Sequence, residues 1–391
     1  MNYVLFDGQH HQKLKPLTLT RPVADLRVGL FKIHEKWSLS LNNKVEIRCK
    51  DYLSDKFSSQ TNQVEVGISA ALLPSDELLE AIEELSDNTI MMKDGHVLAI
   101  KPLPEENDLM EKKLSKYSVL KYNGEAKFIN RPMDIFLLNE EQIIKDLNFI
   151  NKEELATDKY GDGNLIIGDQ VFIEEGAKIT GATLNSTYGP IYIGKNSEVM
   201  EGVNIRGPFA LMDESIVKMG AKIYGPTTIG PKCKVGGELG NVVFQGFSNK
   251  AHDGFLGNSV IGYWCNLGAD TNTSNLKNNY SEVKSYNYAS ETFESTGTMY
   301  CGLIIGDHSK SGINTMFNTG SVLGAFVNVF DGGFPPKFIN SFSWGGKQGF
   351  VTYDFEKAIE VARVVMSRRN EELDEKTHSI YKSIFNSIVN K

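Results

Sequence analysis

Two hydrophobic periods divide the chain. Up to about residue 155, short apolar runs such as NYVLF (2–6) and HVLAI (96–100) are typical of strands, and residues 75–86 have the spacing of an amphipathic helix. From about residue 164, apolar residues recur at every sixth position. Residues 352–387 return to helical spacing. We therefore predict an α/β domain over 1–155, a repetitive domain over 160–345 and a C-terminal α-helix within 346–391.

The six-residue period predicts a hexapeptide parallel β-helix, because neither a helix (period 3.6) nor a lone strand (period 2) produces it. In such a coil each hexapeptide forms one side of a triangle and points one apolar residue inward. We predict the left-handed form, interrupted by a loop over the polar residues 272–302. The predicted inward positions are Ile167, Ile173, Ile179, Ile193, Val199, Ile205, Leu211, Val217, Ile223, Ile229, Val235, Val243, Phe255, Ile261 and Leu267.

Composition narrows the class of protein. The formal charge of −8 argues against nucleic-acid binding, which usually needs a basic face. No run of about 18 apolar residues is present, and MNYVLFDG lacks the features of a signal peptide. The four cysteines have no CxxC spacing and are expected to be reduced thiols rather than a zinc site. A cytoplasmic protein that acts on small molecules is the expectation, and the flat sides of such a coil favour a homotrimer.

The stretch NKAHDGFLG (249–257) places His252 among glycines at the level of the coil. Acyl transfer from a thioester to an amine needs a base near neutral pH, which histidine supplies, and a fixed N–H donor for the developing oxyanion. The alternative is that His252 is an exposed turn residue. A coil of about eighteen residues would place Asp270 one rung above His252, where it could orient the ring.

Residues 248–275, SNKAHDGFLGNSVIGYWCNLGADTNTSN, resemble the acetyltransferase half of the bifunctional UDP-N-acetylglucosamine diphosphorylase/glucosamine-1-phosphate N-acetyltransferases. The family pattern is similar to SKAGHxxYLGDxxIGxxxNIGAGTxxxN. This resemblance implies acetyl-CoA as the acyl donor and an amino-sugar phosphate as the acceptor. It implies His252 as catalytic, Phe255, Asn266 and Asn275 as substrate-binding, and Ala269 as acetyl-CoA-binding. To these residues we add Asp270 as catalytic from the rung count, Lys250 as a substrate-binding cation and Lys310 as acetyl-CoA-binding.

The sequence departs from that family at the acceptor site. Phe255 replaces a tyrosine, and the family's two phosphate-binding cations fall near Tyr224 and Gly240. Basic residues nearby would have to replace them, namely Lys250, Lys234, Lys222 or Arg206. The acceptor could therefore differ from glucosamine 1-phosphate or bind differently.

FDGQHHQKLKPLTLTRPVADLRVG (6–29) resembles the opening of sugar-phosphate nucleotidyltransferases, approximately LxGGxGTRLxPLTxxxPKxLxPVxG. This implies a truncated domain of that fold, in which Mg²⁺ could assist. Only Gly8 remains of the glycine-rich loop, Val23 replaces the catalytic lysine, and no GDxP segment supplies a metal-binding aspartate. The implied nucleotide-binding residues are Gly8, Lys13, Lys15 and Arg21; the metal ligands stay unknown.

The leading hypothesis is an amino-sugar-phosphate N-acetyltransferase fused to a nucleotidyltransferase-type domain, in sugar-nucleotide synthesis for the cell envelope. One alternative keeps nucleotidyl transfer alone, with the coil as a trimer scaffold. Another is a non-catalytic regulator that binds a sugar nucleotide. The other histidines, His10, His11, His34, His96, His308 and His378, are expected to be structural.

Overall fold

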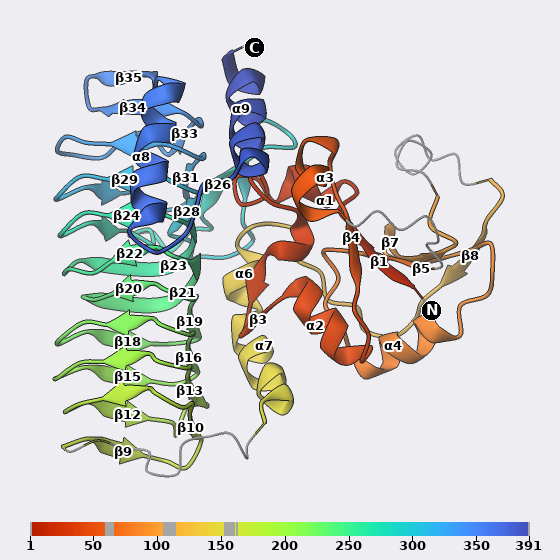
Figure 1. Cartoon of the computed structure of the whole chain (residues 1–391), viewed down its shortest axis with the longest axis horizontal. Helices are drawn as coiled ribbons and strands as arrows, with labels where there is room; N and C mark the ends of the chain where they lie inside the picture. The colour runs from red at the N-terminus through yellow and green to blue at the C-terminus, as the bar shows by residue number, and fades with distance from the viewer. Residues whose placement is uncertain (1, 59–65, 105–114, 152–160, 162, 390–391) are drawn as a thin grey trace.

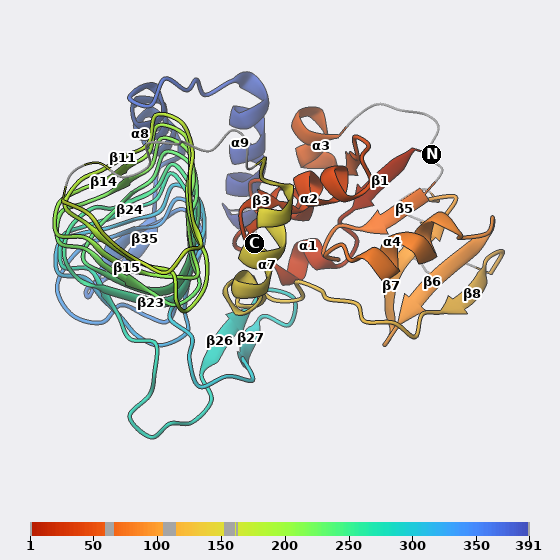
Figure 2. The ribbon, with the colours of Figure 1, turned by 90° about the horizontal axis from the view of Figure 1, so that it is seen from below.

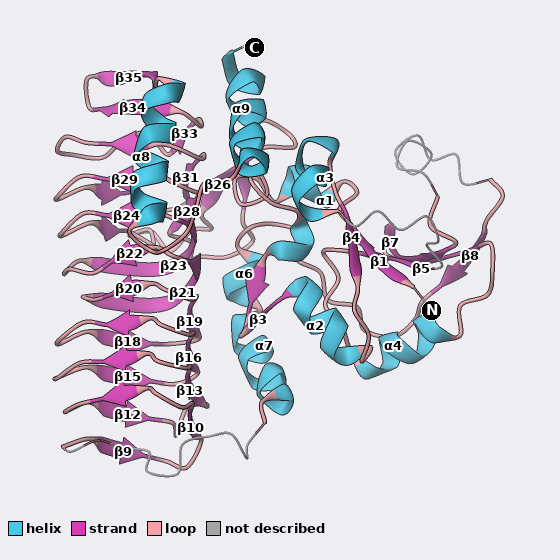
Figure 3. Cartoon of the chain, viewed as in Figure 1, coloured by secondary structure: helices cyan, strands magenta, loops and turns pink. Residues whose placement is uncertain are grey.

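The computed structural model describes residues 2–58, 66–104, 115–151, 161 and 163–389. An N-terminal α/β domain stands beside a parallel β-solenoid, and two helices close the chain, as predicted (Figure 1). Figure 3 shows the division into an all-strand column and a mixed domain. The solenoid is triangular in cross-section when seen along its axis (Figure 2). The left-handed sense of the coil stays a prediction.

The N-terminal domain is built on a six-stranded sheet of order β4-β1-β5-β7-β6-β8. The central strands β1 and β5 are parallel and fully buried, which explains their continuous apolar runs. The strands are β1 (Tyr3–Phe6), β4 (Glu46–Arg48), β5 (Val66–Ser69), β6 (Thr89–Lys93), β7 (His96–Lys101) and β8 (Ser118–Lys121), with β2 (Arg27–Val28) and β3 (Phe31–Lys32) as a separate pair. The helices are α1 (His10–Lys13), α2 (Ile33–Ser40), α3 (Asp51–Phe57), α4 (Asp76–Glu83), α6 (Asp134–Leu137) and α7 (Asn139–Asp146), with short 3₁₀ turns η1 (Val23–Asp25) and η2 (Leu147–Phe149).

The solenoid has three faces of stacked parallel strands. The first holds β10 (Val171–Ile173), β13 (Ile191–Ile193), β16 (Phe209–Leu211), β19 (Thr227–Ile229), the later parts of β21 (Glu238–Gly246) and β23 (Phe255–Tyr263), β28 (Leu303–Ile305), β31 (Ser321–Leu323) and β33 (Phe338–Ile339). The second holds β9 (Leu165–Ile167), β12 (Thr183–Asn185), β15 (Asn204–Arg206), β18 (Lys222–Tyr224), the earlier parts of β21 and β23, β25 (Asn272–Thr273) and β30 (Met316–Phe317). The third holds β11 (Lys178–Ile179), β14 (Glu198–Val199), β17 (Ile216–Val217), β20 (Lys234–Val235), β22 (Asn249–Lys250), β24 (Asn266–Leu267), β29 (Lys310–Ser311), β32 (Asn328–Val329), β34 (Ser343–Gly346) and the antiparallel β35 (Gly349–Thr352).

The six-residue series predicts most of the inward positions correctly, from Ile173 to Val235 and again at Ile261 and Leu267. Three positions are wrong by one residue. Ile167 is exposed while Ile166 packs against the core; Val243 faces the N-terminal domain while Phe244 points inward; Phe255 is half-buried while Leu256 points inward. Because side chains alternate along a strand, a slip of one residue exchanges the inner and outer sides.

The segment predicted as a loop over 272–302 is more ordered than expected. Asn272 and Thr273 still belong to the coil, as β25 paired with β30. The chain then leaves the coil and forms an antiparallel hairpin, β26 (Lys284–Asn287) and β27 (Thr292–Ser295). This hairpin lies beside the N-terminal domain (Figure 2): Gln12 donates to the Tyr288 carbonyl at 2.9 Å, and Arg131 donates to the Thr296 carbonyl at 2.9 Å.

The N-terminal domain and the final helices cover part of the solenoid. An outward apolar column on the first face, Val243, Val260, Ile304 and Val322, shares a core with the N-terminal domain. The final helical segment is two helices, α8 (Phe355–Ser367) and α9 (Glu375–Val389). They pack on an aromatic column at one corner of the coil, formed by Phe247, Trp264, His308, Phe326 and Phe342. None of the helices in the described part of the chain is long and apolar enough to cross a membrane.

Candidate functional site

His252 is exposed at the corner where β22 ends and β23 begins, between the third and second faces. The corner needs glycine at its last position. Gly254 has φ +111°, and a Cβ there would collide with the carbonyl oxygen of Thr271 in the next rung. The Asp253 carbonyl accepts the Asp270 N–H at 3.1 Å. The fold therefore presents the imidazole to solvent on a tightly bonded turn.

The expected pairing of Asp270 with His252 is wrong by one residue. The rung here is seventeen residues long, since Asn249 pairs with Asn266, and the Asp270 N–H bonds to the Asp253 carbonyl. Ala269 rather than Asp270 therefore lies above His252. Because this rung has seventeen residues instead of the eighteen assumed, each residue on the next rung lies above a neighbour one position later than predicted, and Asp270 lies above Asp253.

A surface hollow of about 270 Å³ lies beside this corner on the second face. Phe255, half-buried, forms part of its wall, and its N–H donates to Asn272 Oδ1 at 2.8 Å. Lys222, from β18, contributes a cation to this hollow, whereas the positions of the family's two phosphate-binding cations hold Tyr224 and Gly240 in this chain. The full lining is Gly220, Lys222, Gly237, Glu238, Asp253, Gly254, Phe255 and Asn272.

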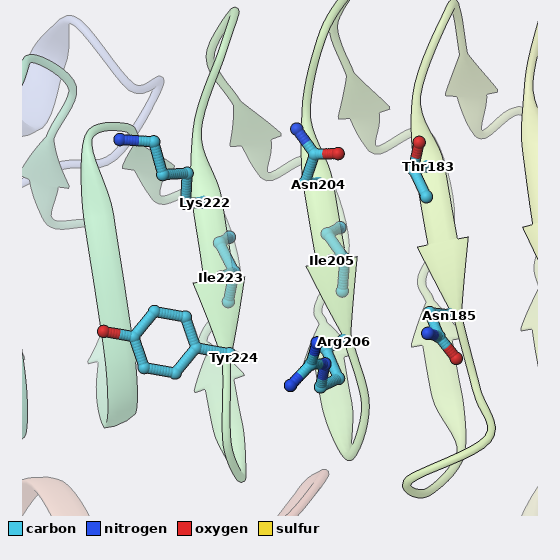
Figure 4. A pocket seen from close by; sticks show the side chains of 8 residues that line it. All are labelled: Thr183, Asn185, Asn204, Ile205, Arg206, Lys222, Ile223 and Tyr224. Carbon is cyan, nitrogen blue, oxygen red and sulfur yellow. The ribbon is translucent and has the colours of Figure 1, made fainter.

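A second hollow of about 270 Å³ adjoins the first, and Lys222 lines both. Figure 4 shows the side chains that line the second hollow. Its side chains come from β12, β15 and β18: Thr183, Asn185, Asn204, Ile205, Arg206, Lys222, Ile223 and Tyr224. Arg206 stacks over the Tyr188 ring at 4.6 Å, and the Tyr224 hydroxyl donates to Glu238 at 2.6 Å. Cations, amides and aromatic rings thus follow one open face away from His252.

Two of the predicted substrate-binding residues are engaged elsewhere. Lys250 is 1% exposed and points into the coil, so its amine cannot reach a ligand at the surface. The Asn275 amide donates to Asn258 Oδ1 at 2.8 Å, at the point where the chain leaves the coil. The sequence did not show that Lys250 is buried, because inward and outward side chains alternate along the strand and Lys250 lies one residue from an outward position.

The predicted substrate-binding residue Asn266 and the predicted acetyl-CoA-binding residues Ala269 and Lys310 lie on the third face or at its corner. Asn266 is exposed and pairs in register with Lys310 on the next rung. Lys310 donates to the His308 carbonyl at 3.0 Å, and burial lowers its pKa below the ordinary value. Ala269 is half-buried and its carbonyl accepts the Asn314 N–H at 2.9 Å. His252 thus stands between the two hollows of the second face and this group on the third face.

In the N-terminal domain, Gly8 turns the chain after β1 with φ +50°. Lys13 and Lys15 are half-buried around α1. The residue that sequence reasoning missed is His10, whose ring stacks on His96 and Phe128 at centroid distances of 5.8 Å each and contacts Asn130 at 3.2 Å. Burial, Lys13 and His96 lower the pKa of His10 to about 4, so it is neutral at pH 7.

Arg21 joins the two domains instead of facing a nucleotide site. Its guanidinium bonds to Asp307 of the solenoid at 2.5 Å and to Asp25 at 2.8 Å, over the Tyr263 ring at 3.7 Å. Burial alone would lower the pKa of Arg21, but Asp307 and Asp25 raise it, so the charge is held. This placement contradicts the predicted contact with a triphosphate. The sequence around Arg21 does not indicate this ion pair, because Asp307 lies 286 residues later in the chain.

No group of three or more His, Cys, Asp or Glu side chains suited to a metal ion occurs among the residues described. His308, expected to be structural, is buried and contacts the Tyr381 hydroxyl at 2.8 Å; burial holds the pKa of His308 well below 6.5. The candidate sites are therefore the exposed His252 corner and the half-buried lysines around α1, and neither contains a metal-binding group among the described residues.

Parts of the chain are similar to known proteins. Residues 3–154 match the sugar nucleotidyl transferase family model. The bifunctional protein GlmU of a Cyanothece species is 27% identical over 173 residues, which are 41% of this chain and 34% of that protein. A bifunctional sugar-1-phosphate nucleotidylyltransferase/acetyltransferase of Sulfurisphaera tokodaii is 27% identical over 290 residues, 72% of this chain and 65% of that protein. This chain therefore spans about a third of the first relative's length.

The solved structure of the polysialic-acid-specific acetyltransferase NeuO aligns with 49% of this chain and 87% of its own, at 13% identity. Its TM-score is 0.28, so no argument rests on it.

Proposed function

The chain is a divergent relative of the bifunctional sugar-1-phosphate nucleotidylyltransferase/acetyltransferases, and we propose that its solenoid transfers an acetyl group from acetyl-CoA to the amine of a sugar phosphate. The observation that carries the proposal is the position of His252. It is exposed at a rigid corner, beside a hollow that contains an aromatic ring and a lysine. A pocket with convergent polar groups next to a potential base is the usual form of an active site.

In the proposed reaction, the acceptor amine attacks the thioester carbonyl carbon. His252 takes a proton from the amine as the new C–N bond forms, and the C–S bond then breaks to release CoA, whose sulfur takes up a proton. The Ala269 N–H, above His252 on the next rung, is the proposed donor to the thioester oxygen. Exposure of His252 suits this role, because its imidazole must exchange its proton between turnovers.

We place the acceptor on the second face. Phe255 would pack against the sugar ring, and Lys222 would neutralise its phosphate, with Arg206 one rung further along the same face. Because Lys222 lines both hollows, one ligand can bridge them. This assignment explains how the site works without cations at Tyr224 and Gly240. A neighbouring chain of a cytoplasmic homotrimer would complete the walls of this open face.

A second activity, sugar-1-phosphate nucleotidyl transfer, is favoured by the family match over residues 3–154. The N–H groups near Gly8 and the cations of Lys13 and Lys15 would contact the phosphates. Mg²⁺ would be held there mainly by the substrate phosphates, as is common for this ion. Arg21 would act only in the domain interface. We therefore expect this second activity to be weaker than acyl transfer.

The test is CoA release from acetyl-CoA with glucosamine 1-phosphate and a panel of other amino-sugar phosphates. His252→Ala should abolish release, and Lys222→Met should raise KM for the acceptor with a smaller effect on kcat, since a phosphate contact is present in both ground and transition states. Glu201→Ala is the matched control, because Glu201 is exposed at the same corner of a lower rung. Full turnover by His252→Ala would refute the assignment.

A further inference from the structure

Lys250 occupies a position that belongs to the hydrophobic core of the coil. It lies in register with Val235 on the rung below. Val235 pairs with Val217, and Val217 pairs with Val199. Leu267 occupies the next inward position of the third face, on the rung above. A lysine therefore interrupts a column of aliphatic side chains, and it does so on the rung that carries His252.

The Lys250 amine is fully occupied by main-chain acceptors. Its Nζ lies 2.7 Å from the His252 carbonyl, 3.1 Å from the Asp253 carbonyl and 3.3 Å from the Gly236 carbonyl. Three carbonyls match the three N–H donors of an ammonium group. Two of these carbonyls belong to the corner that presents His252, and the third belongs to the corner of the rung below.

This arrangement is costly, and an aliphatic residue would avoid the cost. A buried ammonium loses its hydration, and replacement of a buried charge by a packed apolar residue is often neutral or stabilising. Two carboxylates of the corners, Asp253 and Asp270, favour the charged form, but burial outweighs them and lowers the pKa of Lys250 to about 8. The coil needs no charge at this level for its own packing, since the rungs above and below use Leu267 and Val235.

We propose that Lys250 is a positioning residue: from inside the coil, its ammonium fixes the main chain of the His252 corner and so holds the imidazole in place for acyl transfer. This inference rests on the proposed acetyltransferase function. It assigns Lys250 a role that involves no contact with either substrate. It also accounts for a polar side chain in the core at this rung, next to the exposed base.

The variant Lys250→Met removes the three donors and keeps a side chain of similar length. We expect kcat to fall by about ten- to a hundredfold, because small misplacements of a catalytic group have effects of that size, with little change in KM for either substrate. Leu267→Met is the matched control: it places a methionine at the inward position one rung above and removes no donor, so kcat should be close to wild type.

A pH profile separates positioning from a general loss of stability. In the wild type, kcat should fall as pH rises through about 8, because Lys250 then loses its charge and one N–H donor. Lys250→Met should lack this alkaline limb and keep its low kcat between pH 7 and 9. The proposal is overturned if Lys250→Met is as active as the wild type, or if it is slower but retains the same alkaline limb.

A measurement on the wild type covers the case in which Lys250→Met does not fold. With ¹³Cε1-labelled histidine, the His252 resonance, assigned through His252→Ala, should shift near pH 8 in addition to its own titration. Absence of that second step overturns the inference. This readout needs no turnover, so it is distinct from the test of function: a protein that releases no CoA with any acceptor refutes the acetyltransferase, whereas the His252 resonance still tests the coupling with Lys250.

Discussion

The contact between Arg21 and Asp307 should carry much of the coupling between the two domains. Asp307 is 2% exposed and accepts three hydrogen bonds: from Arg21 at 2.5 Å, from Thr20 at 2.6 Å and from the Tyr263 N–H at 2.8 Å. Asp307→Asn is the perturbation of choice. An asparagine keeps an oxygen for the Tyr263 N–H but removes the charge that faces Arg21.

The structure sets the expected size of the effect. Removal of one partner of a buried ion pair destabilises a protein by about 3–5 kcal/mol, because the other charge stays buried without compensation. Arg21 retains Asp25 at 2.8 Å, so we expect the lower end, about 3 kcal/mol. An exposed pair should behave differently: Lys145→Met, which breaks the surface pair with Glu141, should cost less than about 1 kcal/mol.

Urea unfolding can measure this through the three tryptophans. Trp37 is buried in the N-terminal domain and bonds to the Leu72 carbonyl, while Trp264 and Trp344 lie in the solenoid, so Trp264→Phe/Trp344→Phe provides a background that reports on the N-terminal domain. Asp307→Asn, Arg21→Met and the double variant form a cycle. Additive losses, with a coupling energy below about 0.5 kcal/mol, would refute the claim that this pair joins the domains.

Two further predictions concern buried groups. The pKa of His10 is about 4 in the folded chain and about 6.5 in the unfolded chain. The free energy of unfolding should therefore fall by about 3 kcal/mol as pH decreases from 6.5 to about 4. In His10→Phe the free energy of unfolding should depend less steeply on pH over this range, and an unchanged dependence would contradict the burial of a neutral His10. All four cysteines are buried, and burial raises the pKa of Cys233 and of Cys301 to about 12. The thiols of the native protein should therefore react with a disulfide reagent at pH 8 far more slowly than those of the urea-unfolded protein. Equal rates would contradict their burial.

The solenoid was predictable because its physical cause is periodic. Each rung needs one inward apolar side chain per face, so the regular spacing of apolar residues from Ile173 to Val235 predicts the solenoid. The period fails where the rungs change length. Leu239 follows Val235 by four residues and Phe244 follows Leu239 by five, so a fixed count of six from Val235 leads to Asn241 instead. The expected continuation at Val243 lies one residue from Phe244, on the other side of the strand.

The candidate site was predictable only in part for the same reason. The location of His252 at a corner follows from the glycines around it and from the neighbouring inward residues. The partner of each corner residue depends on the length of one particular rung, which is seventeen residues between Asn249 and Asn266. Asp270 therefore pairs with Asp253, and Lys222, thirty residues before His252, joins the site through the register of the second face.

Charged residues were the hardest to assign, because the sequence of a motif does not show whether a lysine or arginine in it binds a ligand or forms contacts within the protein. Arg21 lies in a segment that resembles a phosphate-binding loop, yet its carboxylate partner comes from a solenoid corner 286 residues later. Lys250 lies two residues before the candidate base, yet it points into the core. In both cases the fold uses a full charge to hold main chain or domains beside a candidate site. Burial of such a charge is unfavourable because the charge loses its hydration. A buried charge at such a position is therefore explained if the geometry that it holds contributes to function.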